Sequence, residues 1–188
     1  MCGIFSILNN HYSDQQIEFC FEKGSKRGPE KSDLVNFNNK KIILGFHRLA
    51  INGYQDPNAD QPFDLNNISL ICNGEIYNWK KLYSMMGVIG KSNSDCEVII
   101  HLYLKYGIEQ TVKMLDGVFS FILYDRTDNK VFVARDAFGV RPLFIKKTKH
   151  DNVSSTYSFA SELKQLIHLD NHRDIKQVTP GTYSVYNI

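Results

Sequence analysis

Cys2 is the residue of this sequence that offers the most chemistry, because it directly follows the initiator methionine. Removal of Met1 would leave Cys2 with a free α-amine beside its thiol. A thiol with an ordinary pKa of about 8.5 is mostly protonated at neutral pH and needs a base, and an α-amine titrates at about 7.7–8.0. We therefore expect Cys2 to be a nucleophile that carries its own general base. Taken alone, the position also fits a small buried residue at the start of a strand.

The spacing of the cysteines bears on their redox state and on a second possible kind of active site. The four cysteines lie far apart, without a C-x-x-C or zinc-ligand spacing, and are Cys2, Cys20, Cys72 and Cys96. This spacing is typical of reduced thiols in a cytoplasmic compartment. A Cys–His hydrolase that uses Cys72 or Cys96 with His47 or His101 is an alternative. It is disfavoured because His47 falls in an expected strand and His101 on an expected helix, where both have structural explanations.

Length and composition limit the class of protein. The chain has 188 residues, 43% hydrophobic and 22% charged, which is ordinary for a globular protein and excludes a disordered or fibrous one. The net charge is +2 and the basic residues are scattered, which argues against nucleic-acid binding. The N-terminus lacks a basic secretory segment, and the apolar runs are shorter than the roughly 18 residues of a membrane span. We expect one soluble, cytoplasmic domain over residues 1–188, without a membrane partner.

The elements that must position Cys2 can be predicted from the apolar pattern. Strands are expected at 2–8, 33–37, 42–48, 68–72, 117–125, 130–135, 142–147, 156–160 and 182–187. Helices are expected from Ser13 to about Gly24, from the capping box at 94–97 to Gly107, and at 108–115 and 161–168. Strands in groups followed by helices in groups favour an α+β fold of mostly antiparallel sheets covered by helices.

Seven sequence blocks in a fixed order strengthen the interpretation of Cys2. They are MCGIF (1–5), RGPE (27–30), FHRLAI (46–51), NGEIYN (73–78), SDCEVI (94–99), LDGVFSFILYD (115–125) and RDAFGVRPLF (135–144). Together they resemble the glutaminase domain of glutamine-hydrolysing asparagine synthetases. These are class II glutamine amidotransferases with the N-terminal-nucleophile (Ntn) hydrolase fold. The resemblance spans residues 2 to about 185 and implies a four-layer αββα sandwich with Cys2 at the end of an inner strand, facing a cleft.

The resemblance also implies a reaction. The Cys2 thiolate would attack the γ-amide carbon of L-glutamine while its α-amine relays the proton, and ammonia would leave. Water would then release L-glutamate from the γ-glutamyl thioester. The side-chain NH₂ of Asn73 and the backbone N–H of Gly74 would form the oxyanion hole, although Asn-Gly is otherwise typical of a hairpin turn. Neither a metal nor an organic cofactor is expected for this half-reaction.

A set of glutamine-binding residues is implied in the same way. Arg48 would bind the α-carboxylate with two hydrogen bonds, and Asp95, helped by Glu75, would bind the α-ammonium. Other residues expected to line the pocket are Leu49, Ala50, Ile51, Asn52, Asn73 and Gly74. Arg48 could instead form a surface ion pair, and Asp95 is also favoured as an acid in the first turn of a helix.

Two features depart from the family pattern. Glu30 stands where the family commonly has aspartate, so the loop that this carboxylate holds could be set differently. No Ser-Gly-Gly-x-Asp-Ser loop is found, so the synthetase domain that would use ATP and Mg is expected to be absent from this chain. We expect the ammonia to serve asparagine synthesis from aspartate in a synthetase domain or subunit, and leave a homodimer open. The alternative outside catalysis is a regulatory module that binds glutamine without cleaving it.

Overall fold

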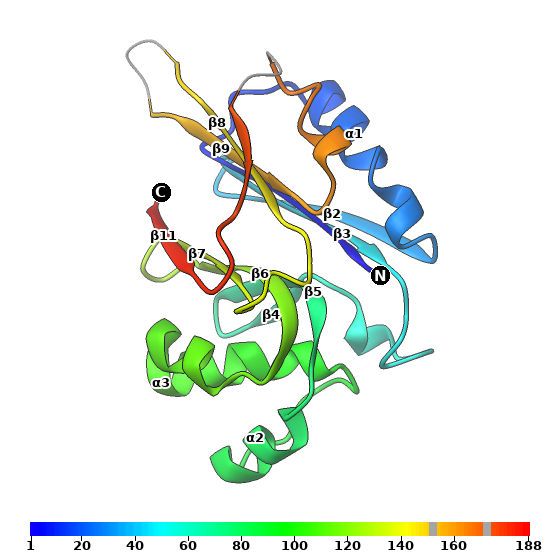
Figure 1. Cartoon of the computed structure of the whole chain (residues 1–188), viewed down its shortest axis with the longest axis vertical. Coiled ribbons are helices and arrows are strands. Elements are labelled where there is room, and N and C mark those ends of the chain that lie inside the picture. The colour runs from blue at the N-terminus through cyan, green and yellow to red at the C-terminus, as the bar shows by residue number, and fades with distance from the viewer. Residues whose placement is uncertain (151–153, 171–173) are drawn as a thin grey trace.

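Two β-sheets stacked face to face form the centre of the structure, a computed structural model that describes residues 1–150, 154–170 and 174–188 (Figure 1). The six-stranded sheet contains, in spatial order, β10 (Ile175–Gln177), β8 (Phe144–Thr148), β9 (Thr156–Ala160), β1 (Gly3–Leu8), β3 (Ile42–Arg48) and β2 (Lys31–Phe37). The five-stranded sheet contains β11 (Tyr183–Asn187), β7 (Lys130–Arg135), β6 (Gly117–Asp125), β5 (Ile68–Ile76) and β4 (Phe63–Leu65). Every strand pairing within the described ranges is antiparallel.

Helices cover the outer face of each sheet. Helix α1 (Asp14–Glu22) packs on the six-stranded sheet, and helices α2 (Trp79–Met86) and α3 (Val98–Met114) pack on the five-stranded sheet (Figure 1). The four layers are therefore helix, sheet, sheet and helix, as expected. None of the helices in the described ranges has both the length and the apolar character needed to cross a bilayer.

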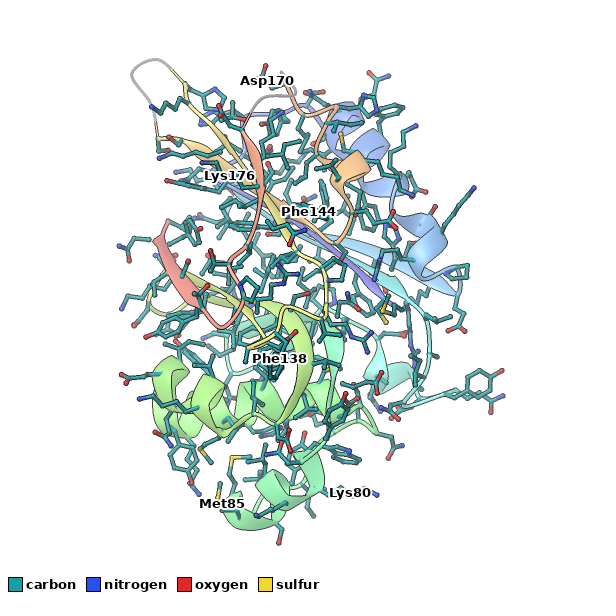
Figure 2. The ribbon with its side chains drawn as sticks, in the orientation of Figure 1. Lys80, Met85, Phe138, Phe144, Asp170 and Lys176 are labelled. Atoms are coloured by element: carbon teal, nitrogen blue, oxygen red, sulfur yellow. The ribbon has the colours of Figure 1, made fainter. Side chains whose placement is uncertain are left out.

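The alternation of side chains along β1 places Cys2 between the sheets. All six residues of β1 are buried, so the strand supplies two cores. Ile4 and Leu8 belong to the core between the two sheets, whereas Phe5 and Ile7 pack beneath α1. Cys2 precedes the strand on the same face as Ile4 and packs against the core between the sheets. Figure 2 shows that side chains fill this layer.

The alternation along β5 places Asn73 on the facing side of the same layer. Ile71 lies in the core between the sheets, whereas Cys72 and Ile76 lie in the core beneath α2 and α3. Asn73 and Glu75 therefore share the face of Ile71, which is the face directed at the six-stranded sheet. The nucleophile candidate and the oxyanion candidate come from different sheets that meet across one core.

The helix starts agree in part with those predicted from the sequence. Ser13 caps α1, because its Oγ accepts a hydrogen bond from the Gln16 N–H at 3.3 Å. Ser94 likewise caps a 3₁₀ turn at Asp95–Glu97 that leads into α3. The expected capping box at 94–97 is wrong in one respect: Glu97 binds the backbone N–H groups of residues 91 and 92 instead of Ser94. Its carboxylate thus fixes the loop before the helix.

Gly107 divides α3 as the sequence predicted. Its φ of 75° and ψ of 172° are non-helical, so the two expected helices are the two halves of one kinked element. The positive φ explains why glycine stands there, since other residues are strained in that region.

Other expectations about the elements were wrong or incomplete. The helix expected at 161–168 is only a 3₁₀ turn, Leu163–Gln165. The buried Gln165 side chain there donates to the Phe21 carbonyl oxygen at 3.2 Å, which ties the segment to the end of α1. The sequence reading missed α2 and the three-residue strands β4 and β10. Strands of that length are too short for a periodic pattern.

Candidate active site

Cys2 lines a pocket between the sheets and is only partly exposed. Its thiol lies 3.4 Å from the Leu49 carbonyl oxygen, to which it donates, and 3.5 Å from the Leu49 N–H, from which it accepts. Burial raises the pKa of the Cys2 thiol above its ordinary value, and the Leu49 backbone contact offsets this only in part. The thiol is therefore protonated at neutral pH, so any nucleophilic role requires a base close by.

Arg27 holds the backbone of Cys2. The Arg27 Nε donates to the Cys2 carbonyl oxygen at 2.8 Å, and the guanidinium lies 3.7 Å from Glu162. The sequence reading placed Arg27 in the RGPE block but gave it no role. A largely buried arginine bound to the backbone of Cys2 helps to fix where the thiol points.

Asn73 and Gly74 lie within β5, opposite Ser120 and Phe119 of β6, so the hairpin-turn interpretation of Asn-Gly is wrong. Asn73 is 2% exposed, and its Nδ2 has no hydrogen-bond partner in the described part of the chain. Buried donors without a partner are rare in proteins and need an explanation. A ligand oxygen in the pocket would supply the missing acceptor.

Gly74 is required by the close approach of β6. A β-carbon at this position would lie 2.7 Å from both Phe119 Cβ and the Val118 carbonyl oxygen. In the ladder, the N–H groups of Cys72 and Ile76 point away from β6 and donate to Gln61 and Asp95 at 2.6 Å each. The Gly74 N–H lies between these two on the same strand edge and points the same way.

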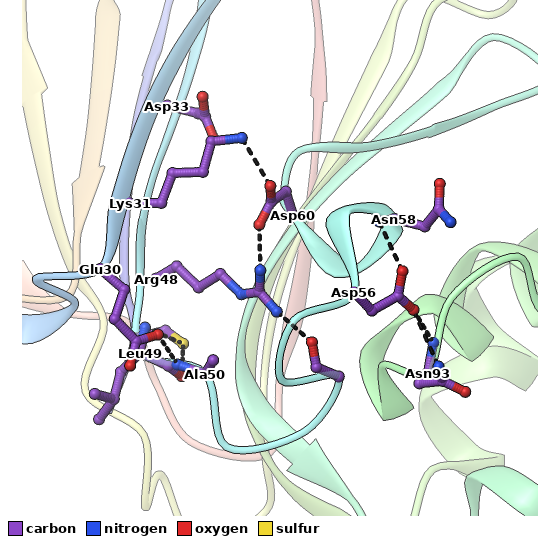
Figure 3. A network of polar contacts seen from close by, with 12 residues as sticks. Glu30, Lys31, Asp33, Arg48, Leu49, Ala50, Asp56, Asn58, Asp60 and Asn93 are labelled. Carbon is purple, nitrogen blue, oxygen red and sulfur yellow. Dashed lines mark hydrogen bonds and ion pairs between the residues drawn. The ribbon is translucent and has the colours of Figure 1, made fainter.

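Arg48 ends β3, and its guanidinium is already engaged (Figure 3). The Nη1 donates to Asp60 Oδ1 at 2.5 Å, and the Nη2 donates to the Gly53 carbonyl oxygen at 2.6 Å. Asp60 also pairs with Lys31 at 2.7 Å, so it joins two cations. The sequence reading missed Asp60, which orients Arg48. An arginine has five N–H donors, so donors remain for a substrate carboxylate, and that role stays a prediction.

Glu30 holds the loop that follows Arg48. Its Oε2 accepts a hydrogen bond from the Ala50 N–H at 2.6 Å (Figure 3). The longer side chain at this position therefore still reaches the loop, which contains the predicted pocket residues Leu49, Ala50, Ile51 and Asn52. Ile51 is 58% exposed although it lines the pocket, so it lies at the rim.

Asp95 is buried and bridges two site elements. Its Oδ1 accepts from Asn52 Nδ2 at 3.0 Å, and its Oδ2 accepts from the Ile76 N–H at 2.6 Å. The carboxylate therefore ties the loop after β3 to the end of β5. Each oxygen keeps a further lone pair that could accept from an ammonium.

Glu75 forms an ion pair with Arg141 in the pocket lining. The Arg141 Nη2 donates to Glu75 Oε1 at 2.7 Å, and the Arg141 Nη1 contacts the Met1 sulfur. Arg141 belongs to the RDAFGVRPLF block but was not among the predicted site residues. Met1 itself lines the pocket beside Cys2.

One pocket brings together all ten residues that the sequence predicted. Its lining includes Cys2, Arg48, Leu49, Ala50, Ile51, Asn52, Asn73, Gly74, Glu75 and Asp95, together with Met1 and Arg141. Two carboxylates, two guanidinium groups and an unpartnered amide donor thus share the pocket with the Cys2 thiol, and Cys72 and Cys96 line it as well. This set of groups suits a small zwitterion that carries an amide. Their individual roles stay predictions.

The Cys–His alternative finds no support in the geometry. His47 is stacked on Phe21 and is held by Ser32 at 2.7 Å and by the Phe21 carbonyl oxygen at 2.9 Å. His101 contacts Glu97 on its own helix at 3.4 Å. Both histidines have structural partners, and neither lines the pocket. Within the described ranges, no group of three or more His, Cys, Asp or Glu side chains is arranged to hold a metal ion.

Curated relatives cover the whole chain. It is 38% identical over 204 residues to the asparagine synthetase [glutamine-hydrolyzing] of Gallus gallus and 37% identical over 200 residues to that of Homo sapiens, with all of this chain aligned in both cases. A probable asparagine synthetase of Acanthamoeba polyphaga mimivirus is 35% identical over 191 residues, which include 97% of this chain. The chain spans about a third of the length of these relatives, namely 34%, 34% and 33%.

Solved structures share the fold. The glutamine phosphoribosylpyrophosphate amidotransferase of B. subtilis matches 99% of this chain and 47% of its own, with a TM-score of 0.79 and 26% identity. An allosteric regulatory enzyme of purine biosynthesis matches the same 99% of this chain and 47% of its own, with a TM-score of 0.80 and 23% identity, and supports the fold alone. The sequence model of the glutamine amidotransferase domain family matches residues 1–186. The chain therefore belongs to the glutamine amidotransferase domain family.

Proposed function

We propose that this chain hydrolyses L-glutamine to L-glutamate and ammonia through a γ-glutamyl thioester on Cys2. The observation that carries the proposal is the buried, unpartnered Asn73 Nδ2 in the same pocket as the Cys2 thiol. A donor that finds its acceptor only when substrate is present is what an oxyanion hole requires. The Gly74 N–H, directed to the open edge of β5, would be the second donor.

The reaction follows from the groups in the pocket. With Met1 removed, the α-amine of Cys2 takes the thiol proton, and the sulfur forms a bond to the γ-amide carbon of glutamine. The oxyanion is held by Asn73 and Gly74 until the C–N bond breaks and the protonated nitrogen leaves as ammonia. Water then attacks the thioester carbon, the α-amine accepts its proton, and glutamate leaves as the thiol re-forms. No cofactor is part of this proposal.

Removal of Met1 has two consequences in this proposal. It frees the α-amine that serves as the base, and it clears a side chain that lines the pocket and contacts Arg141. The raised pKa of the thiol supports the need for that base. A protein that keeps Met1 would therefore be inactive for two separate reasons.

Similarity to glutamine-hydrolysing asparagine synthetases supports a destination for the ammonia. We assign it to asparagine formation from aspartate by an ATP- and Mg-dependent synthetase domain or subunit outside this chain. We place the activity in the cytoplasm, a reducing compartment that would keep the four cysteines as the free thiols found here. A homodimer stays a prediction.

Intact-mass measurement after incubation with a diazoketone analogue of glutamine tests the proposal. We expect loss of the mass of Met1 and gain of one adduct, which peptide mapping places on Cys2. Cys2→Ala should lose the adduct and glutamate release while it still binds glutamine, and Cys20→Ser is the matched control that keeps both. Active protein that retains Met1, or a single adduct on another cysteine, would refute the proposal. Glutamine binding by the processed wild type without any turnover would favour the regulatory module instead.

A further inference from the structure

The RDAFGVRPLF block, residues 135–144, has no role in the reaction as proposed, although many buried hydrogen bonds fix its backbone. It leads from β7 into β8. The carboxylate of Asp136 is 2% exposed and accepts hydrogen bonds from four backbone N–H groups. These belong to Phe119 at 3.1 Å, Phe138 at 3.0 Å, Val140 at 3.2 Å and Arg141 at 3.4 Å.

The side chain of Arg135 holds the same loop by binding backbone carbonyl oxygens of the loop. It is 6% exposed, and its guanidinium donates to the carbonyl oxygens of Arg141 at 2.9 Å, Gly139 at 2.6 Å and Val178 at 2.7 Å. Apolar burial contributes little at the tip of this loop, because Phe138 is 88% exposed. A buried carboxylate and a buried guanidinium thus hold the backbone of residues 138–141, up to and including Arg141.

The side chain that this backbone carries reaches the pocket. Arg141 has a side-chain exposure of 12%, and its Nη2 donates to Glu75 Oε1 at 2.7 Å. Glu75 lies on the inner face of β5, two residues after the oxyanion candidate Asn73, and its side chain is 36% exposed. Oε2 of Glu75 makes no hydrogen bond or ion pair within residues 1–150, 154–170 and 174–188. One oxygen of the carboxylate is therefore occupied, and the other is available.

We propose that Arg141 is a positioning residue that fixes the Glu75 carboxylate so that its second oxygen meets the α-ammonium of glutamine. The proposal rests on glutamine as the substrate. A glutamate side chain that is held before binding loses fewer rotamers when it meets the ligand, so the contact is stronger. The Arg141 guanidinium does not repel the substrate ammonium strongly, because Glu75 balances its charge. Asp95 supplies a further negative charge to the pocket. Arg141 thereby contributes to the choice of α-amino acids over other amides.

The test compares glutamine with glutaramate, the same amide without the α-amino group, on processed protein. Arg141→Met should raise the glutamine KM about tenfold at nearly unchanged kcat, as expected for loss of one positioned charge-assisted contact. The KM for glutaramate should stay within about twofold, because that substrate offers no ammonium. Glu75→Gln should show the same pattern, and the double variant should be no worse than Glu75→Gln alone. Arg141→Lys should recover part of the preference, and Phe138→Ala on the same loop is the control that leaves both substrates unchanged.

Equal impairment of both substrates by Arg141→Met, or no change in either, would overturn the proposal. Additive effects of the two single variants would overturn it as well, since residues acting as one unit are not additive. If the wild type released no glutamate, the proposed hydrolysis would fail separately. Calorimetric binding of glutamine and glutaramate to Cys2→Ala, with and without Arg141→Lys, would then still decide the role of Arg141. The lysine variant also serves if the methionine variant does not fold.

Discussion

Replacement of Asn73 by alanine separates an oxyanion role from a structural one. The Nδ2 of Asn73 is buried and has no partner within the described residues, so its removal breaks no hydrogen bond of the resting protein. Removal of one oxyanion donor typically costs about 100- to 1,000-fold in kcat, or about 2.7–4 kcal/mol of transition-state stabilisation. Because the donor meets its acceptor only in the transition state, kcat and kcat/KM should fall together while KM changes little.

The free energy of unfolding should change less in Asn73→Ala than it would if Asn73 were a structural residue. Truncation of a buried asparagine that holds its neighbours leaves those neighbours unsatisfied and costs about 1–3 kcal/mol. Here the orphaned Nδ2 disappears with the side chain, so we expect the free energy of unfolding to change by less than about 1 kcal/mol. Asn73→Asp keeps the shape but puts a negative charge where the oxyanion forms, so it should be at least as inactive as Asn73→Ala.

Glutamate release under saturating glutamine, paired with urea unfolding, measures both effects. Ser120→Ala is the matched control, because Ser120 lies opposite Asn73 in the ladder and also carries a buried oxygen without a partner in the described ranges. It should leave kcat unchanged. The reasoning is refuted if Asn73→Ala stays within threefold of the wild-type kcat, or if its loss appears in KM alone.

Three further predictions concern the scaffold. Gly107→Ala should cost at least about 1 kcal/mol in urea unfolding, because φ is 75° there and no atom within 4 Å could compensate. Burial alone would raise the pKa of Glu97, but hydrogen bonds from His101 and the 91–92 loop outweigh it and lower the pKa to about 2. Glu97→Gln should therefore cost about 2 kcal/mol at pH 7, and thermal melts should show this difference shrinking as the pH falls from about 4.5 to 2, where wild-type Glu97 becomes protonated. Ile71→Val and Ile99→Val should each cost about 1 kcal/mol, but only Ile71→Val, between the sheets, should also lower kcat in the glutaminase assay.

The strands could be predicted where burial is continuous or strictly alternating. β1 and β6 are buried over almost their whole lengths, and their apolar runs identify them without tertiary information. The segment 161–168 has apolar residues at helical spacing, Leu163, Leu166 and Ile167, yet it forms only a 3₁₀ turn. The segment is tied to the end of α1 by the hydrogen bond from Gln165 to the Phe21 carbonyl oxygen, a long-range contact that local periodicity does not contain.

Helix α2 shows the opposite error. Its buried residues Leu82, Tyr83 and Met86, with the half-buried Trp79, follow the 3.6-residue period, and Gly87 ends it at φ 68°. This periodicity is visible in the sequence, but the helix was not predicted because it directly follows the NGEIYN block. The block itself belongs mostly to β5, which runs to Ile76, and α2 begins at Trp79, directly after the block ends.

The site shows a different limit of sequence reasoning. The types of the pocket residues follow from the blocks, but their partners are remote: Glu75 and Arg141 lie 66 positions apart, and Arg48 and Asp60 lie 12 apart. Nothing local links such pairs, because hydrogen bonds between residues far apart in the chain depend on how the sheets stack. Asn-Gly illustrates this most directly, since its usual turn preference is overridden by pairing along the whole of β5.

The placement of the chemistry between two sheets explains why these long-range bonds are needed. Cys2 extends from the six-stranded sheet and Asn73 from the five-stranded sheet, so no single element fixes the distance between nucleophile and oxyanion donor. The apolar core between the sheets sets their separation, but apolar packing is not directional and leaves small shifts uncorrected. Directional bonds around the pocket supply that correction: Asp95 joins the loop after β3 to β5, and Arg141 joins the loop after β7 to the same strand. A site divided in this way needs polar cross-links around the pocket as much as a core beneath it.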